Sequence, residues 1–183
     1  MQSHQSSQGK IEPTQREKEA VFMEMVEQYQ DAIFRFLYFR VGRRSLATDI
    51  TQDTFTKTWM YLVSGKTITY PEAFLYRAAK NALIDYYKKQ KTSSLDTLME
   101  EGYDPASTAD TDHILHQDDI ESIRTLMETL DEESKQIIFL RYTEERSIED
   151  IARIYKKSVN AMTVHIHRLL KKLRARQHDE NTT

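Results

Sequence analysis

A cluster of cationic side chains occupies residues 153–176, where the chain carries eight lysines and arginines and no acidic residue. They are Arg153, Lys156, Lys157, Arg168, Lys171, Lys172, Arg174 and Arg176. Ammonium and guanidinium groups at this density bind a polyanion by neutralising its phosphates and releasing counterions, which is non-covalent chemistry. The segment therefore predicts a nucleic-acid contact, with a solvated basic face of an amphipathic helix as the alternative.

Helical spacing divides this segment into a buried and an outward side. Apolar residues recur every three or four positions from Met162 to Leu173, as on one face of a helix. Ser158 can cap this helix, and Ser147 with Asp150 resembles a capping box before a shorter helix. The pair predicts a helix-turn-helix in which early residues approach base edges and later ones contact phosphates. The predicted DNA-facing residues are Ser158, Asn160, Thr163, Val164, His167, Arg168, Lys171 and Lys172.

A second basic face lies earlier in the chain, on a helix predicted to begin at Pro71. Its predicted core stripe contains Leu75, Ala78, Ala79, Ala82 and Tyr86. The opposite face carries Arg77, Lys80, Asn81, Ile84 and Lys88, flanked by Tyr70, Tyr76 and Tyr87. Basic side chains interleaved with aromatic rings suit a surface that follows a phosphate backbone and stacks on unpaired bases. By composition alone, an ordinary solvated helix face explains the pattern equally well.

A third set of polar residues shares one side of a helix predicted at 46–62. Ala47, Ile50, Phe55, Trp59 and Leu62 form its broad apolar arc. The opposite face carries Asp49, Gln52, Asp53 and Thr56. It is available to a protein partner. A preceding helix at 17–41 carries its own apolar face, formed by Phe22, Val26, Tyr29, Ile33 and Leu37.

These elements predict an all-α chain of two small helical bundles joined by a flexible acidic linker. The net charge of −3 taken alone argues against nucleic-acid binding, but it is an average over the chain. The acidic residues are concentrated at 92–133, which hold thirteen acids and one base, Arg124. The expected organisation is a disordered leader (1–16), a first bundle (17–91), the linker (92–117), a second bundle (118–176) and a disordered tail (177–183). The second bundle is expected to begin with Ile120, Ile123, Leu126 and Leu130.

Several classes of protein are excluded. The chain has no cysteine, which removes disulfides, thiolate metal sites and cysteine nucleophiles and fits a reducing, cytoplasmic location. Its first twenty residues are polar, and no uncharged run is long enough to span a bilayer. Four glycines leave little room for a phosphate-binding loop, and His165 and His167 point to different sides of one helix. We expect no enzymatic activity, no cofactor, no metal and no membrane insertion.

Two segments of the first bundle resemble sigma region two of the extracytoplasmic-function (group IV) sigma factors. They are residues 47–59 (ATDITQDTFTKTW) and 73–86 (AFLYRAAKNALIDY), whose order and spacing are specific to that family. Residues 148–176 resemble the helix-turn-helix of sigma region four, with 130–132 and 139–142 matching the helices before it. The absence of a sizeable domain between the two regions is also typical of this minimal group.

The resemblance implies a partner for each polar surface. Asp49, Gln52, Asp53 and Thr56 would bind the clamp coiled coil of the largest subunit of core RNA polymerase. The loop 64–70 and the basic helix would bind the melted minus-ten element, through Tyr70, Arg77, Lys80, Asn81, Ile84 and Lys88. The helix-turn-helix would bind the duplex minus-thirty-five element of promoter DNA and the flap of the other large subunit. An anti-sigma factor is expected to cover the polymerase-binding faces in the resting cell.

This chain departs from the family pattern at two places. Lys156 and Lys157 stand where the turn of the helix-turn-helix usually has a glycine and an apolar residue, and Ala161 and Met162 replace a common Thr-Val pair. The loop before Pro71 is shorter than in many relatives. Two other functions remain as alternatives: a free-standing helix-turn-helix regulator, and a sigma-like protein that acts only through protein partners.

Overall fold

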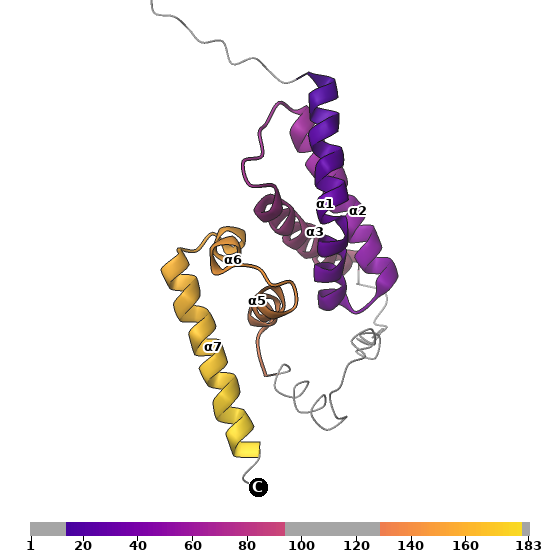
Figure 1. The fold of residues 1–183 in the computed structure, drawn as a ribbon. Coiled ribbons are helices and arrows are strands. Elements are labelled where there is room, and N and C mark those ends of the chain that lie inside the picture. The colour runs from indigo at the N-terminus through magenta and orange to yellow at the C-terminus, as the bar shows by residue number, and fades with distance from the viewer. Residues whose placement is uncertain (1–13, 94–128, 181–183) are drawn as a thin grey trace, which may run out of the picture.

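The computed structural model describes residues 14–93 and 129–180, and every regular element within these ranges is an α-helix (Figure 1). The predicted all-helical fold is confirmed. The helices are α1 (Gln15–Val41), α2 (Arg44–Val63), α3 (Pro71–Ser93), α5 (Glu132–Tyr142), α6 (Ile148–Tyr155) and α7 (Val159–Glu180). None of those in the described ranges is both long and apolar enough to cross a membrane. The first two residues of the predicted linker, 92 and 93, belong to α3, the rest of it lies outside these ranges, and the domain limits stay predictions.

Local sequence determines where the first helices begin and end. Thr14 caps α1: its hydroxyl accepts a hydrogen bond from the Glu17 N–H (3.3 Å), and the Glu17 carboxylate accepts one from the Thr14 N–H (2.6 Å). The same helix ends at Gly42, whose φ of 67° lies in the left-handed region that favours glycine. Pro71 begins α3, as predicted, because its fixed φ suits the first helical turn.

The core of the first bundle forms where α1, α2 and α3 meet. Ile33, Phe36 and Leu37 of α1 are fully buried, and Tyr76 of α3 meets the Phe36 ring edge-on with 5.0 Å between ring centroids. The prediction that Tyr76 flanks the basic face is therefore wrong. Burying a large aromatic ring against another ring stabilises the fold more than leaving it beside the lysines. Of the predicted stripe, Leu75, Ala79 and Ala82 are buried, while Ala78 and Tyr86 are partly exposed.

The inward side of α2 is partly polar. Thr51, Thr54 and Thr58 are buried among the apolar residues of this helix. Their hydroxyls donate hydrogen bonds of 2.7, 2.7 and 2.8 Å to the carbonyls of Ala47, Ile50 and Thr54. A threonine can be buried in a helix at little cost because its hydroxyl bonds the carbonyl one turn earlier. The predicted apolar arc is also buried, except that Trp59 is partly exposed.

The second half of the molecule is built on α5, α6 and α7. Both predicted serine caps are present: the Ser147 hydroxyl accepts from the Asp150 N–H at 3.1 Å, and the Ser158 hydroxyl accepts from the Ala161 N–H at 3.2 Å. Leu140, Ile151 and Met162 form the centre of the core. Leu130, Ile166 and Leu169 are buried as predicted, and Leu173 is partly exposed. The predicted Ile120, Ile123 and Leu126 lie outside the described residues.

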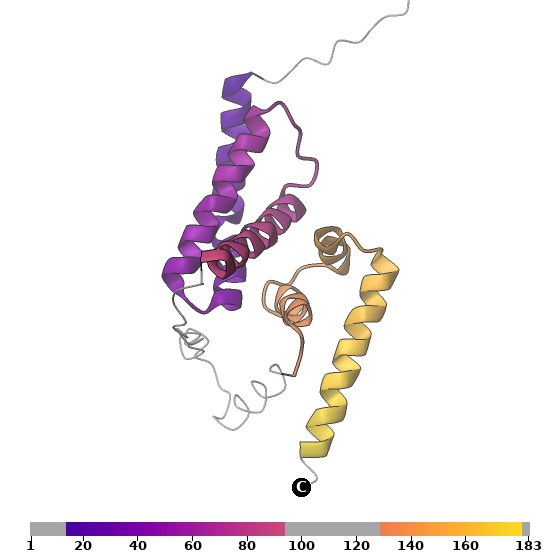
Figure 2. The same ribbon diagram turned by 180° about the vertical axis from the view of Figure 1, so that it is seen from behind.

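The two halves pack against each other. Figures 1 and 2 show α5 and α6 lying between α7 and the bundle of α1, α2 and α3. The main contacts join α6 to α3 and α5 to α1. The rings of Phe39 in α1 and Phe139 in α5 stack with 4.4 Å between centroids.

Candidate polymerase and nucleic-acid interfaces

The first candidate interface is the polymerase stripe, which we define as Asp49, Gln52, Asp53 and Thr56 on α2. All of these side chains are exposed, and their spacing places them on one face of the helix. Lys57 lies beside them, with its Nζ 2.8 Å from a carboxylate oxygen of Asp53 and 3.2 Å from one of Asp85 in α3. These carboxylates raise the pKa of Lys57 because they stabilise its charged form. The stripe is therefore an accessible row of hydrogen-bonding and anionic groups.

An apolar groove borders this stripe, between α1 and α2. Its open volume is about 620 Å³. It is lined by Glu19, Phe22, Met23, Gln52, Phe55, Thr56 and Trp59. Met23 is 62% exposed, so a large apolar side chain faces solvent next to the polar stripe. The sequence did not indicate Met23 as a functional residue. It is not part of the apolar face predicted for this helix, and only its position next to Phe22 connects it with the groove.

The second candidate interface is the minus-ten surface, which we define as Tyr70, Arg77, Lys80, Asn81, Ile84 and Lys88. Part of it contacts the C-terminal half. The Arg77 Nη1 donates a 2.9 Å hydrogen bond to the Arg153 carbonyl near the C-terminal end of α6. The Arg153 guanidinium lies 5.2 Å from the centroid of the Tyr70 ring. Arg77 and Tyr70 therefore each contact the same residue of α6.

Lys80 is the most enclosed cation of this surface. Its Nζ lies 3.8 Å from the centroid of the Tyr155 ring in α6 and 4.0 Å from a carboxylate oxygen of Glu133 in α5. Burial lowers the pKa of Lys80, and the negative charge of Glu133 opposes that change. Burial also raises the pKa of the Tyr155 phenol. The lysine therefore contacts a ring face and lies near a carboxylate, with 25% of its side chain still exposed.

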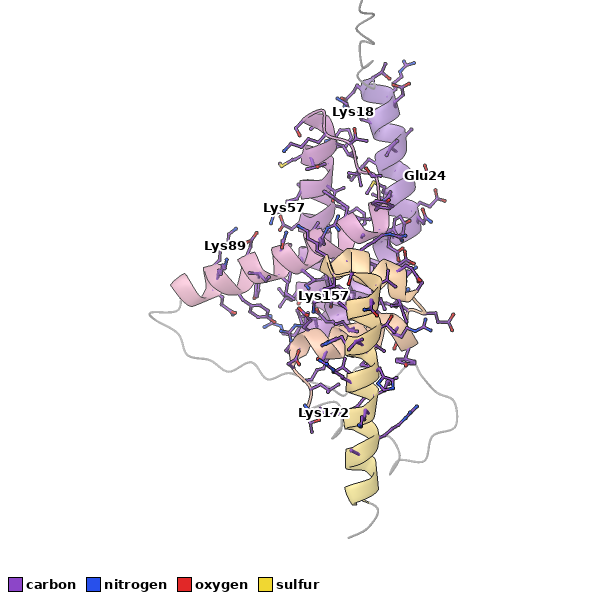
Figure 3. All side chains as sticks on the ribbon, turned by 90° about the vertical axis from the view of Figure 1, so that its left-hand side faces the viewer. Lys18, Glu24, Lys57, Lys89, Lys157 and Lys172 are labelled. Atoms are coloured by element: carbon purple, nitrogen blue, oxygen red, sulfur yellow. The ribbon has the colours of Figure 1, made fainter. Side chains whose placement is uncertain are left out.

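The rest of the minus-ten surface lies further along α3. Asn81, Ile84 and Lys88 are exposed, and Ile84 exposes 47% of its area. Figure 3 shows the end of α3, with Lys89, extending away from the C-terminal helices. The structure therefore places these residues on one helix, except for Tyr70, which directly precedes α3, and divides the surface into a part that contacts the C-terminal half and an open part.

The third candidate interface is the outward face of α7. Ser158, Asn160, Thr163, Val164, His167, Arg168, Lys171 and Lys172 are all exposed. The Thr163 hydroxyl donates to the Val159 carbonyl at 2.9 Å, within the same helix. The Lys172 Nζ donates to the Thr129 carbonyl at 3.5 Å. The turn before α7 is tight, because Lys156 adopts the left-handed φ of 53°.

A cluster of charged residues at the junction of the two halves escaped sequence reasoning. The Arg35 guanidinium in α1 donates two hydrogen bonds, of 2.6 and 2.8 Å, to the carboxylate of Glu144. Arg146 lies 2.9 Å from the carboxylate of Glu72 in α3. Burial raises the pKa of Glu72 and raises that of Tyr76 to about 12, while the Arg146 charge opposes both changes. The partners are far apart in sequence, so no local pattern identifies them.

Two family models match this chain, one in each half. Residues 25–92 match the family model of Sigma-70 region 2, and residues 120–173 match that of Sigma-70, region 4. The chain is 26% identical over 179 residues to the ECF RNA polymerase sigma factor SigW of Bacillus subtilis (strain 168), covering 93% of this chain and 96% of SigW.

Two solved structures share the fold. One is the sigma factor RpoE in complex with the anti-sigma factor NepR from Bartonella quintana, with a TM-score of 0.60, 19% identity and coverage of 85% of this chain and 95% of that one. The other is CnrH in complex with the cytosolic domain of CnrY, with a TM-score of 0.56, 20% identity and coverage of 88% and 90%. With both sigma-70 regions present in order, the chain belongs to the extracytoplasmic-function sigma factors, non-catalytic transcription initiation factors that direct core RNA polymerase to promoters.

Proposed function

We propose that this sigma factor divides its work among the three surfaces described above and catalyses no reaction itself. The observation that carries the proposal is the exposure of the polymerase stripe on α2 and of the basic outward face on α7, at separate places on the molecule. A protein surface and a nucleic-acid surface can therefore be engaged together. Because core polymerase is its partner, the chain acts in the cytoplasm.

The polymerase stripe is assigned to the clamp coiled coil of the largest polymerase subunit. Asp49 and Asp53 supply negative charge, and Gln52 and Thr56 supply hydrogen-bonding groups beside the apolar groove. A polar row next to exposed apolar side chains is the usual composition of a protein interface, where buried aromatic anchors supply most of the affinity. Phe22 and Trp59 are the anchors that this groove offers.

The outward face of α7 is assigned to the duplex minus-thirty-five element. Asn160, Thr163, Val164 and His167 lie in its first half, which enters the major groove in a helix-turn-helix and meets base edges. Arg168 and Lys171 follow, where the helix passes the phosphates. Ser158 and Lys172 complete the contact at its two ends.

The minus-ten surface is assigned to the melted promoter strand. Tyr70 exposes 57% of its area and offers a ring on which a base can stack. Arg77, Lys80 and Lys88 supply positive charge for the backbone, and Asn81 and Ile84 lie between them on α3. The RpoE and CnrH structures are complexes with NepR and the cytosolic domain of CnrY. We propose that this chain likewise binds an anti-sigma protein.

Gel filtration with purified core polymerase, followed by run-off transcription from a library of genomic fragments, tests the proposed function. We expect the chain to elute with core polymerase and to produce promoter-specific transcripts that core polymerase alone does not make. DNA binding without co-elution would indicate a free-standing regulator. Co-elution without specific transcripts would indicate a protein that acts only through protein partners.

A further inference from the structure

The first two turns of α7 offer few groups that could form a hydrogen bond with a base. Residues 158–166 include no lysine, arginine, aspartate or glutamate. The Ser158 hydroxyl accepts the Ala161 N–H at 3.2 Å, and the Thr163 hydroxyl donates to the Val159 carbonyl at 2.9 Å, so both are already engaged within the helix. Hydrogen bonding can therefore supply only part of the base recognition in this stretch.

Val164 is the apolar side chain at the centre of the outward face. It lies two residues after Met162 and two before Ile166, and since successive residues of a helix are about 100° apart, it points away from both. Met162 and Ile166 are buried, whereas Val164 is 41% exposed. Asn160, one turn earlier, and Arg168, one turn later, are exposed on the same side. An aliphatic side chain is thus surrounded by the polar residues that are proposed to meet DNA.

The surroundings of Val164 prepare it for a rigid contact. Figures 1 and 2 show α7 at the edge of the molecule, next to α5 and α6, and its buried stripe faces these helices. A β-branched side chain in a helix has one strongly preferred χ1 rotamer, so it loses little conformational entropy on contact with a ligand. A single exposed valine is ordinary on a protein surface, but this one lies where the helix would come closest to the bases.

The major groove offers one apolar group to such a side chain, the C5 methyl group of thymine. The other base edges present hydrogen-bond donors and acceptors, and covering these with a valine would remove water without supplying a hydrogen bond in return. Contact with a methyl group instead removes apolar surface from water on both sides. Cytosine carries a hydrogen at the same ring position, and in 5-methylcytosine a methyl group takes its place.

We propose that Val164 recognises the C5 methyl group of one pyrimidine in the minus-thirty-five element. Thymine supplies this group in unmodified DNA, and 5-methylcytosine supplies the same group in methylated DNA. The inference rests on the proposed function of α7 and adds the chemical group that this residue selects. Asn160 and Val164 are about 6 Å apart along the helix axis, and stacked base pairs are about 3.4 Å apart. The pyrimidine therefore lies within about two base pairs of the position that Asn160 reads.

Deoxyuridine tests this inference, because it keeps the hydrogen-bonding edge of thymine and lacks only the methyl group. Holoenzyme is reconstituted from core polymerase and the full-length chain. It is titrated with a short fluorescein-labelled duplex that carries the minus-thirty-five element of a promoter recovered by the run-off screen. Each thymine of the element is replaced by deoxyuridine, one at a time. We expect one of these replacements to lower the affinity about four-fold, as for the loss of one buried methyl group.

Val164→Ala shows whether the protein senses the methyl group through this residue. The variant should bind the thymine duplex more weakly than the native chain does, and it should show no further loss with deoxyuridine at the same position, because the two changes remove one contact. Val159→Ala is the matched control, since Val159 has the same side chain and a similar exposure but lies about 140° away around the helix. This control should keep the full deoxyuridine loss. Circular dichroism confirms that both variants stay helical.

A second set of duplexes separates the two sources of the methyl group. The same base pair is changed from thymine–adenine to cytosine–guanine, with and without a methyl group at C5 of the cytosine. Native holoenzyme should bind the methylated duplex about four-fold more tightly than the unmethylated one, and the Val164→Ala holoenzyme should bind both equally. The absence of a gain in the native holoenzyme would overturn the proposal that the methyl group itself is recognised.

Two comparisons keep this inference apart from the assignment of α7. If Lys171→Ala weakens all duplexes but no deoxyuridine loss depends on Val164, the assignment stands and methyl recognition is refuted. A deoxyuridine loss of equal size in the native and Val164→Ala chains refutes it as well, because the methyl group would then act through the DNA or through another residue. If neither Lys171→Ala nor Val164→Ala changes duplex binding, the assignment of α7 fails and the inference fails with it.

Discussion

Replacing Lys156 by glycine should stabilise the protein, although it removes a side chain at the centre of the helix-turn-helix. Lys156 ends α6 with φ 53° and ψ 38°. Its N–H donates to the Arg153 carbonyl at 3.4 Å, and the Lys157 N–H donates to the Ala152 carbonyl at 2.9 Å. This pair of bonds is a Schellman motif, which requires the left-handed conformation at its first residue after the helix.

The magnitude follows from two opposing terms. A side chain held in the left-handed conformation costs about 1 to 2 kcal/mol relative to glycine. Glycine, in turn, gives the unfolded chain extra freedom worth about 0.5 to 1 kcal/mol. The net stabilisation expected for Lys156→Gly is therefore about 0 to 1.5 kcal/mol, and its central value of about 0.75 kcal/mol would move the midpoint of unfolding measurably.

Urea unfolding followed by far-UV circular dichroism measures this change. Lys156→Ala is the matched control, because it loses the same charge but keeps the strain, and it should gain nothing. Glu145 has the same φ of 53°, so Glu145→Gly should gain a similar amount. A lower midpoint for Lys156→Gly, or an equal gain for Lys156→Ala, would refute the argument that backbone strain is stored in this turn.

Three further predictions concern the other surfaces. Reversing Asp49 and Asp53 to lysine should abolish binding to core polymerase in titrations while the circular dichroism spectrum stays helical; unchanged affinity would contradict the clamp assignment. Lys171→Ala should weaken all duplexes alike, whereas Asn160→Ala should cost about 1 to 3 kcal/mol at one or two base positions in a panel of single-base variants. The Asp131 carboxylate accepts a 2.9 Å hydrogen bond from the Ser134 N–H, and this bond lowers the pKa of Asp131. Removing this helix cap with Asp131→Ala should cost about 1 kcal/mol of stability at neutral pH, measured by thermal unfolding. Because the folded pKa is depressed, that difference should shrink as the pH falls below about 4, and a constant difference would argue against the cap.

The helices could be predicted because their signals are local. Pro71, Ser147 and Ser158 each begin a helix through one side chain or one fixed dihedral, and the structure has helices starting where these residues indicate. The outward face of α7 follows from the same logic, since its apolar positions from Met162 onward leave only one side for polar residues. The interpretation of α7 as a DNA-binding helix needed this polarity and the basic residues together.

Burial of polar and amphipathic residues was harder to predict. Thr54 and Thr58 are fully buried, because their hydroxyls donate hydrogen bonds to carbonyls of their own helix. A pattern based on polarity alone would place these residues on the solvent-facing side. Tyr76 was placed on the wrong side because it follows Leu75 directly and lies next to Arg77. Its partner Phe36 is on another helix, so only the packing of α1 against α3 decides its position.

The junction of the halves could not be predicted at all. Arg35 and Glu144 are 109 residues apart, and Arg77 and Arg153 are 76 apart. Nothing in the spacing of either charge identifies its partner, because surface-type residues pair with whichever complementary group the fold brings near. The sequence therefore indicated the candidate surfaces but not that part of one of them contacts the C-terminal half.

The ionic composition of the junction between the two halves has a consequence for how the protein responds to salt. Its ion pairs are Arg35–Glu144, Arg40–Glu132 and Glu72–Arg146, and counterions weaken exposed pairs such as Arg40–Glu132. The Glu144 side chain is only 3% exposed, so its two hydrogen bonds from Arg35 are screened much less. The stacked rings of Phe39 and Phe139 carry no net charge, so salt does not screen their contact. The packing of the two halves should therefore weaken only in part as the ionic strength rises.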